Sequence, residues 1–258
     1  MAVTETASSG RTHERGQPVR GWPAWHSALL DYRAPSVGRS AWQLASTLLP
    51  YAGLWWLMVR SIRDGQPYAV TLALAAVAAL FLVRAFVLFH DCVHGSLFRI
   101  LELNTFFGYV LGVLAFTPLD DWRFSHLRHH ASYANLDARG FGDIWTMTLA
   151  EYGAAPAAKR LYYRFFRHPL VLLGMGALIS FVLRFRLPIR KSKRKERVSV
   201  LFTNLLLAGM ILTAARTIGL QTYVMIQLPV IWMAGAMGIW LFYVDRKSTR
   251  LNSSHVSQ

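Results

Sequence analysis

The chain of 258 residues is 54% apolar and only 16% charged, and it carries a formal net charge of +15 at pH 7. Soluble domains average roughly 25% charged residues, so the composition excludes an ordinary soluble fold and predicts an all-α integral membrane protein. The excess of lysine and arginine fits loops that face anionic lipid headgroups, whereas nucleic-acid binding is excluded because no basic recognition helix or RNA-binding signature is present.

Residues 1–40 are predicted to form a polar cytoplasmic leader. They are rich in Ser, Thr, Gly, Arg and Pro and lack the apolar run of a signal peptide. We therefore expect no cleavage here, and we expect the membrane domain to span residues 41–244.

Four apolar stretches approach the roughly 20 helical residues that cross a bilayer. They are residues 41–59, 68–89, 198–215 and 223–244. The short link at 61–67 predicts that the first two form an antiparallel hairpin. Arg84 lies inside the second stretch, where we expect it to reach the interface or face a polar pocket.

Two further apolar stretches, residues 105–117 and 170–185, are predicted to be re-entrant or interfacial. The first has only 13 residues, and a crossing there would separate two histidine clusters onto opposite faces of the membrane. The second precedes eight Lys or Arg between Arg184 and Arg197, and a crossing would place this basic loop outside, against the positive-inside rule. Four crossings then put the N-terminus, both clusters and the basic loop on the cytoplasmic side.

Five of the nine histidines form two clusters, HDCVH and HLRHH. Their members are His90, His94, His126, His129 and His130. Residues three or four apart share one face of a helix, so each cluster presents imidazoles side by side. Neutral imidazole is the commonest protein ligand for first-row metals, and five exceed what one tetrahedral zinc ion takes. The sequence therefore predicts a site for more than one metal ion.

Polar and aromatic residues near the clusters are candidates for supporting roles. Ligating histidines usually donate their second ring N–H to a carboxylate or carbonyl. The candidate acceptors are Asp91, Asp121, Asn135, Asp137 and Asp143, with Asp143 of the GDIWT stretch preferred. Trp122 and Trp145 are candidates to line a substrate path. The alternatives are solvated residues of a water-side lobe at 131–167 and interfacial anchoring of the tryptophans.

Four segments together resemble the membrane fatty acid desaturases, particularly the bacterial acyl-lipid omega-6 (delta-12) type. The segments are HDCVHGSLF, FTPLDDWRFSHLRHH, NLDARGFGDIWTMTLAEY and LPVIWMAGAMGIWLFYV, and the resemblance covers roughly residues 31–244. It implies two non-haem iron ions held by three histidine boxes, with His90, His94, His126, His129 and His130 as the ligands from the first two.

The resemblance also implies an activity and a location. We expect oxygen-dependent desaturation of fatty acyl chains in membrane lipids, with O2 as oxidant and electrons from a separate ferredoxin- or cytochrome-type donor. The protein is expected in the bacterial inner (cell) membrane, with its metal site cytoplasmic. The third box should follow residue 244, but residues 245–258 are rich in Ser, Arg and Asn with His255 alone, so we interpret them as a non-native or disordered tail on a chain cut short.

Other functions remain open on the residues alone. The same scaffold suits a hydroxylase, ketolase or epoxidase of lipids or carotenoids. Without a third box the chain is also interpretable as an inactive fragment or a metal carrier. A membrane metalloprotease fits less well, because HDCVH lacks the general-base Glu of HExxH.

Overall fold

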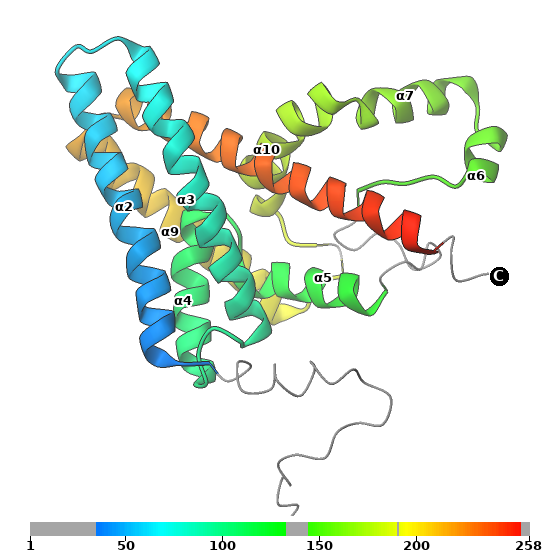
Figure 1. Ribbon diagram of the computed structural model, residues 1–258, viewed down its shortest axis with the longest axis horizontal. Coiled ribbons are helices and arrows are strands. Elements are labelled where there is room, and N and C mark those ends of the chain that lie inside the picture. Colours follow the sequence, from blue (N-terminus) through cyan, green and yellow to red (C-terminus); the bar gives the residue numbers. More distant parts are fainter. Residues whose placement is uncertain (1–34, 133–143, 190, 254–258) are drawn as a thin grey trace, which may run out of the picture. The chain divides into compact units, whose positions relative to one another are not determined.

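The computed structural model describes residues 35–132, 144–189 and 191–253, and every regular element in those ranges is a helix (Figure 1). The all-α prediction is therefore confirmed. The helices are α2 (Val37–Arg63), α3 (Tyr68–His94), α4 (Leu101–Leu114), α5 (Leu119–Ala131), α6 (Leu149–Ala154), α7 (Ala157–Arg167), the short segments η1 (Leu170–Met175), α8 (Gly176–Leu178), η2 (Ile179–Leu183) and η3 (Arg184–Arg186), then α9 (Arg194–Thr217) and α10 (Leu220–Ser253). Most of the predicted leader lies outside the described residues.

Three described helices are long and apolar enough to cross a membrane: α3, α9 and the Leu220–Leu241 part of α10. Two bent pairs raise the number to five if each is one span. One pair is α4 with α5, bent by 99°, and the other is α7 with Leu170–Arg186, bent by 63°. The helix α2 has 27 residues but is not apolar enough to join this set. The predicted count of four crossings and two re-entrant segments stays a prediction.

The first two long helices form the expected antiparallel hairpin, and Figure 1 shows them side by side. Ala75, Ala78 and Ala79 of α3 are fully buried, so small side chains lie where the helices pack. The Arg84 guanidinium donates to the Ser46 hydroxyl of α2 at 3.0 Å, a hydrogen bond on the exposed side of the hairpin. Arg84 therefore faces a neighbouring helix.

The chain turns back directly after the first histidine cluster. Gly95 ends α3 one residue after His94 in the left-handed conformation (φ 67°), which glycine adopts without steric cost. Further along, Phe116 also has positive φ (55°), and Pro118 caps the start of α5. These turns bring α5 back to the C-terminal end of α3, so the two clusters meet.

Close packing of α4 depends on two glycines. A Cβ at Gly112 would lie 2.6 Å from the Thr117 carbonyl oxygen and 3.1 Å from the Phe89 ring. A Cβ at Gly108 would lie 2.9 Å from the Leu119 side chain. The absence of side chains at these positions lets α4 approach both α3 and the start of α5.

The helix α10 continues through residue 253, so residues 245–253 of the predicted tail extend it. Residues 254–258 lie outside the described residues. The non-native origin of this tail stays a prediction.

Candidate metal centre

Four of the five predicted histidine ligands meet at one point. His90 and His94 come from the last turns of α3, and His126 and His130 come from α5. One ligand atom from each of the four lies within 4.8 Å of the others. The Nε2 atom of His126 lies at the centre, 3.0 Å from Nε2 of His94 and 3.0 Å from Nε2 of His130.

This spacing fits a metal site. Two imidazole nitrogens bound about 2.1 Å from one ion lie roughly 3 Å apart, as these do. Four neutral imidazoles form a donor set that first-row transition metals accept. The arrangement can therefore hold a metal ion.

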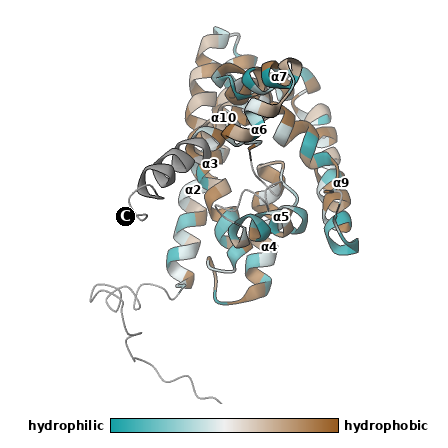
Figure 2. Cartoon of the chain, turned by 90° about the vertical axis from the view of Figure 1, so that its right-hand side faces the viewer, coloured by the Kyte–Doolittle hydropathy of each residue, from teal (hydrophilic) through white to brown (hydrophobic). Residues whose placement is uncertain are grey.

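The pKa values of His126 and His130 on α5 are lowered, which favours the neutral imidazole that binds metals. This helix carries Asp, Arg and His residues along its 13 residues, and Figure 2 shows its hydrophilic character, so it is no segment for the hydrocarbon core. Burial, followed by the neighbouring histidines, lowers the pKa of His126 to about 3. Burial and the charges of His129 and His90 also lower the pKa of His130.

His129 does not join the other four. It is buried at 8% exposure, its ring centroid lies 6.0 Å from that of His130, and it lines a neighbouring cavity. Adjacent positions on a helix point about 100° apart, so His129 and His130 cannot face the same point. The shared face expected for the whole second cluster thus holds for His126 and His130 only.

Arg123 joins the two histidine-bearing helices. Its guanidinium donates to the Val93 carbonyl at 3.2 Å and to the Cys92 carbonyl at 3.3 Å, both at the C-terminal end of α3. It also donates to the Asp120 carboxylate at 3.3 Å within α5. The sequence analysis did not single out Arg123. The one feature that could have indicated it is its position one helical turn before His126.

Asp120 anchors α5 to two other helices. Its carboxylate accepts from the Tyr109 hydroxyl of α4 at 2.7 Å and pairs with Lys195 of α9 at 3.1 Å, while its backbone N–H donates to the Ser199 hydroxyl at 3.0 Å. The side chain is only 6% exposed, so its charge is compensated by partners instead of water. Asp120 was not among the residues singled out from the sequence.

Of the predicted supporting residues, the structure describes Asp91 and Asp121, and neither carboxylate accepts a hydrogen bond from a histidine of the cluster in the interactions found. The Asp91 carboxylate lies 3.7 Å from Nδ1 of His90, beyond hydrogen-bond distance. Asp121 accepts from the Ile189 backbone N–H at 3.2 Å and from the Ser192 hydroxyl, and so it holds the start of the basic loop. Asn135, Asp137 and Asp143 lie outside the described residues.

A largely apolar cavity of about 740 Å³ begins at the histidines. His126, His129 and Trp122 of α5 form a polar part of its lining, and the Trp122 ring stacks on His126 with 4.2 Å between centroids. The other walls come from α3, α7, Leu170–Arg186 and α10, through residues such as Phe86, Phe166, Phe181 and Ile231. Trp145 contacts Tyr162 and Phe166, two of the lining residues.

Comparison with known proteins decides the family. Residues 66–250 match the family model described as fatty acid desaturase. The chain belongs to the fatty acid desaturase family. The resemblance predicted from the histidine motifs is thereby confirmed, and it identifies the chain as a member of an oxidoreductase family of lipid metabolism.

The relatives include desaturases of bacteria, plants and a nematode. The chain is 38% identical over 214 residues to a fatty acid desaturase of Bacillus subtilis (strain 168), which covers 83% of this chain and 60% of that protein. It is 29% identical over 124 residues to the sn-1 oleoyl-lipid 12-desaturase of Synechocystis sp., which covers 47% of this chain and 35% of that protein. It is 40% identical over 52 residues to the sn-1 acyl-lipid omega-3 desaturase (ferredoxin) of Synechocystis sp., which covers 20% of this chain and 14% of that protein. The chain thus spans at most about 60% of these relatives' lengths.

Proposed function

We propose that this desaturase introduces double bonds into fatty acyl chains of membrane lipids in an O2-dependent reaction at histidine-bound iron. The observation that carries the proposal is the apolar cavity that ends at His126 and His129. Its volume of about 740 Å³ lies within the roughly 300–1,000 Å³ of small-ligand pockets. An acyl methylene at the polar end of this cavity would lie beside the four-histidine cluster.

The reaction needs a redox metal because no amino-acid side chain removes hydrogen from an unactivated methylene pair. Bound iron would supply the activation of O2. The neutral imidazoles of the histidine cluster would hold the iron. The apolar walls of the cavity would orient the acyl chain and exclude water from it. Trp122 lines the cavity and stacks on His126, which keeps water from that face of the imidazole.

We propose two non-haem iron ions. The cluster of His90, His94, His126 and His130 suits one ion, and a second ion needs further ligands, for which His129 is the candidate in the described part of the chain. Asp91 and Asp121 remain proposed as residues that orient ligands, as do Asn135, Asp137 and Asp143.

Electrons would arrive from a separate protein of ferredoxin or cytochrome type. Cys92 is the only cysteine of the 258 residues and is buried, so these residues hold no set of thiolates for an iron–sulfur cluster. The name of one Synechocystis relative includes ferredoxin. We further propose that the protein lies in the bacterial inner membrane with the metal site and N-terminus on the cytoplasmic side.

Two measurements on one expressed protein test the proposal. Iron per purified chain is compared with that of His126→Ala and of His168→Ala, whose histidine lies outside the cluster. We expect iron in the unaltered chain and in His168→Ala, and at least about 100-fold weaker binding in His126→Ala.

The second measurement is mass spectrometry of lipids from the expressing cells. Desaturation predicts acyl chains lighter by two hydrogens, which His126→Ala does not produce. Acyl chains that gain an oxygen atom would instead identify a hydroxylase or ketolase. An iron-loaded protein that leaves the lipids unchanged would contradict the proposed activity.

A further inference from the structure

The chain bends sharply just before the second histidine cluster. The helix α4 ends at Leu114, α5 begins at Leu119, and the two are bent by 99°. The direction that α5 takes after this bend decides whether His126 and His130 face the two histidines of α3. A residue that holds the bend therefore contributes to the metal centre.

Phe116, in the middle of the bend, has a backbone conformation that bulky residues rarely adopt. Its φ is 55°, in the left-handed region where a Cβ comes too close to the neighbouring carbonyl oxygen. Its side chain is only 8% exposed. Such a conformation persists where surrounding contacts hold it in place, so we looked for a partner of Phe116 outside α4 and α5.

Arg186, 70 residues further along the chain, is that partner. Its guanidinium donates to the Phe116 carbonyl oxygen and also lies 6.0 Å from the centroid of the Phe116 ring. This carbonyl lies just beyond the C-terminus of α4, where carbonyl oxygens lack partners within the helix and a cation is favourable. Arg186 therefore stabilises the bend at its strained residue.

Arg186 is itself held by α9. Its Nη1 donates to the Oδ1 atom of Asn204 at 2.9 Å, and the Asn204 side-chain amide donates back to the Arg186 carbonyl oxygen at 3.0 Å. Asn204 lies within an apolar stretch of α9, where a polar side chain is costly unless it is paired. This reciprocal pair keeps the guanidinium beside the bend.

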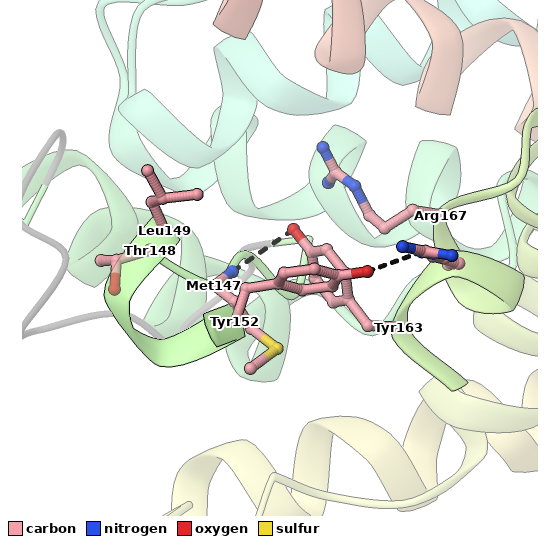
Figure 3. Close-up of a pocket in the computed structure, with 7 residues that line it drawn as sticks. Met147, Thr148, Leu149, Tyr152, Tyr163 and Arg167 are labelled. Atoms are coloured by element: carbon pink, nitrogen blue, oxygen red, sulfur yellow. Dashed lines mark hydrogen bonds between the residues drawn. The ribbon is translucent and has the colours of Figure 1, made fainter. Parts of the chain in front are cut away.

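The same residue connects the cavity wall to the metal-bearing helix. The wall begins with α7, whose nearest polar contacts are local, as the pocket between α6 and α7 in Figure 3 shows. Arg164 donates to the Tyr152 hydroxyl at 2.6 Å. The Met147 backbone N–H donates to the Tyr163 hydroxyl at 3.4 Å. Arg186, at the other end of the wall, is bonded instead to α9 and to the bend before α5.

We propose that Arg186 is a positioning residue of the metal centre, which fixes the direction of α5 by joining the Phe116 carbonyl to Asn204. The inference rests on the proposed function for the role of the histidines as iron ligands. Arg186 does not line the cavity, and it acts on His126 and His130 only through the bend.

The distance between two spin labels on the purified full chain in detergent tests this inference directly. The labels are attached to Phe106→Cys on α4 and Leu127→Cys on α5, at side chains that are 60% and 45% exposed. The native Cys92 is fully buried and so is protected from labelling. We expect a narrow distribution of distances in the chain that retains Arg186 and a shifted or broader one in Arg186→Gln.

Binding of Co²⁺ to the unlabelled proteins shows whether the histidines are displaced as well. Arg186→Gln should bind Co²⁺ about tenfold more weakly, as for other residues that orient metal ligands. The visible absorption of the bound Co²⁺ should also change, because it depends on the geometry of the ligands and not on the amount of folded protein. Thermal unfolding checks each fold, and Arg186→Lys, which keeps the charge without the planar fork, replaces Arg186→Gln if that variant unfolds early.

A second substitution should rescue the first. Glycine adopts positive φ without steric cost, so Arg186→Gln/Phe116→Gly should return towards the original distances. The matched control is Arg194→Gln, which removes an exposed arginine at the start of α9 and should leave the distances and Co²⁺ affinity unchanged.

Three results would overturn the inference. They are unchanged distances or Co²⁺ affinity in Arg186→Gln, equal effects in Arg194→Gln, and a double variant as distorted as Arg186→Gln. Because neither measurement uses lipid or O2, a chain in which Arg186 fixes the bend but which forms no double bond would contradict only the proposed function.

Discussion

At the scale of single residues, His126 is the centre of the metal site. Its Nε2 atom contacts those of two other histidines, its ring lies 4.6 Å from the His90 ring, and Trp122 stacks on its outer face. This enclosure withdraws the imidazole from water and surrounds it with groups that become cationic when protonated. The pKa of His126 is therefore lowered to about 3, so the imidazole stays neutral between that pH and the ordinary value of 6.5.

The lowered pKa of His126 predicts how the metal-free protein responds to acid. Between the folded value of about 3 and the ordinary value of 6.5, the unfolded chain binds a proton that the folded chain does not. Stability should therefore be unaffected by this group above pH 6.5 and should fall as the pH drops below it. Thermal unfolding at pH 7.5 and pH 5 should show a smaller acid loss in His126→Asn than in the unaltered chain. His168→Asn is the control, and equal pH dependence in all three proteins would contradict the prediction.

At the scale of helices, the site depends on how α4 and α5 are held against the end of α3. Arg123 bonds two carbonyls at the end of α3, while Asp120 connects α5 to α4 and α9. The glycines of α4 allow the close approach that the bend into α5 requires. These contacts determine the distance between the two pairs of histidines.

Arg123→Gln should weaken metal binding more than it weakens the fold. It removes the two bonds from α5 to the end of α3, but Asp120 keeps Lys195 and Tyr109 as partners. We expect metal affinity to fall about 10–100-fold, as for other residues that orient ligands. Metal titration and thermal unfolding measure the two effects. Arg128→Gln, an exposed change on the same helix over Phe124, is the control and should retain affinity.

Gly112→Ala should destabilise the protein by about 1–3 kcal/mol. The new methyl group would lie 2.6 Å from a backbone oxygen, which cannot move aside as a side chain can. Gly209→Ala on α9 is the matched control, because its Cβ meets nothing within 4 Å. That change should be neutral or slightly stabilising, since alanine favours the helix over glycine. Thermal unfolding in detergent measures both, and similar effects at the two positions would show that α4 is not closely packed.

At the scale of the whole described part of the chain, the cavity requires segments that are far apart in the sequence. Its walls include Leu82 of α3, Trp122 of α5, Tyr162 of α7, Phe181 of η2 and Ile231 of α10. No one of these helices encloses an acyl chain alone. Their arrangement produces an apolar space that ends at imidazoles, which is the basis of the proposed function.

Gly238→Leu should reduce the length of acyl chain that the cavity accepts. Gly238 lines the cavity, and a Cβ there meets nothing within 4 Å, so a leucine side chain would occupy open space. Analysis of acyl products by chain length should show a loss of the longest chains with iron content unchanged. Gly209→Leu, outside the cavity, is the control. An unaltered product profile in Gly238→Leu would show that the acyl chain lies elsewhere.

The sequence by itself determined the helical class, the hairpin of α2 and α3, the two histidine clusters and the family. The first three follow from local composition and periodicity, because a run of apolar residues or a spacing of three to four is complete within one helix. The family follows from the resemblance of the histidine motifs to those of known desaturases. The tertiary structure alone decided that His129 lines the apolar cavity, that Arg123 joins α3 to α5, and that α7 forms part of the cavity wall. Such contacts depend on where helices cross and how chains bend at Gly95 and Phe116, which no local pattern specifies.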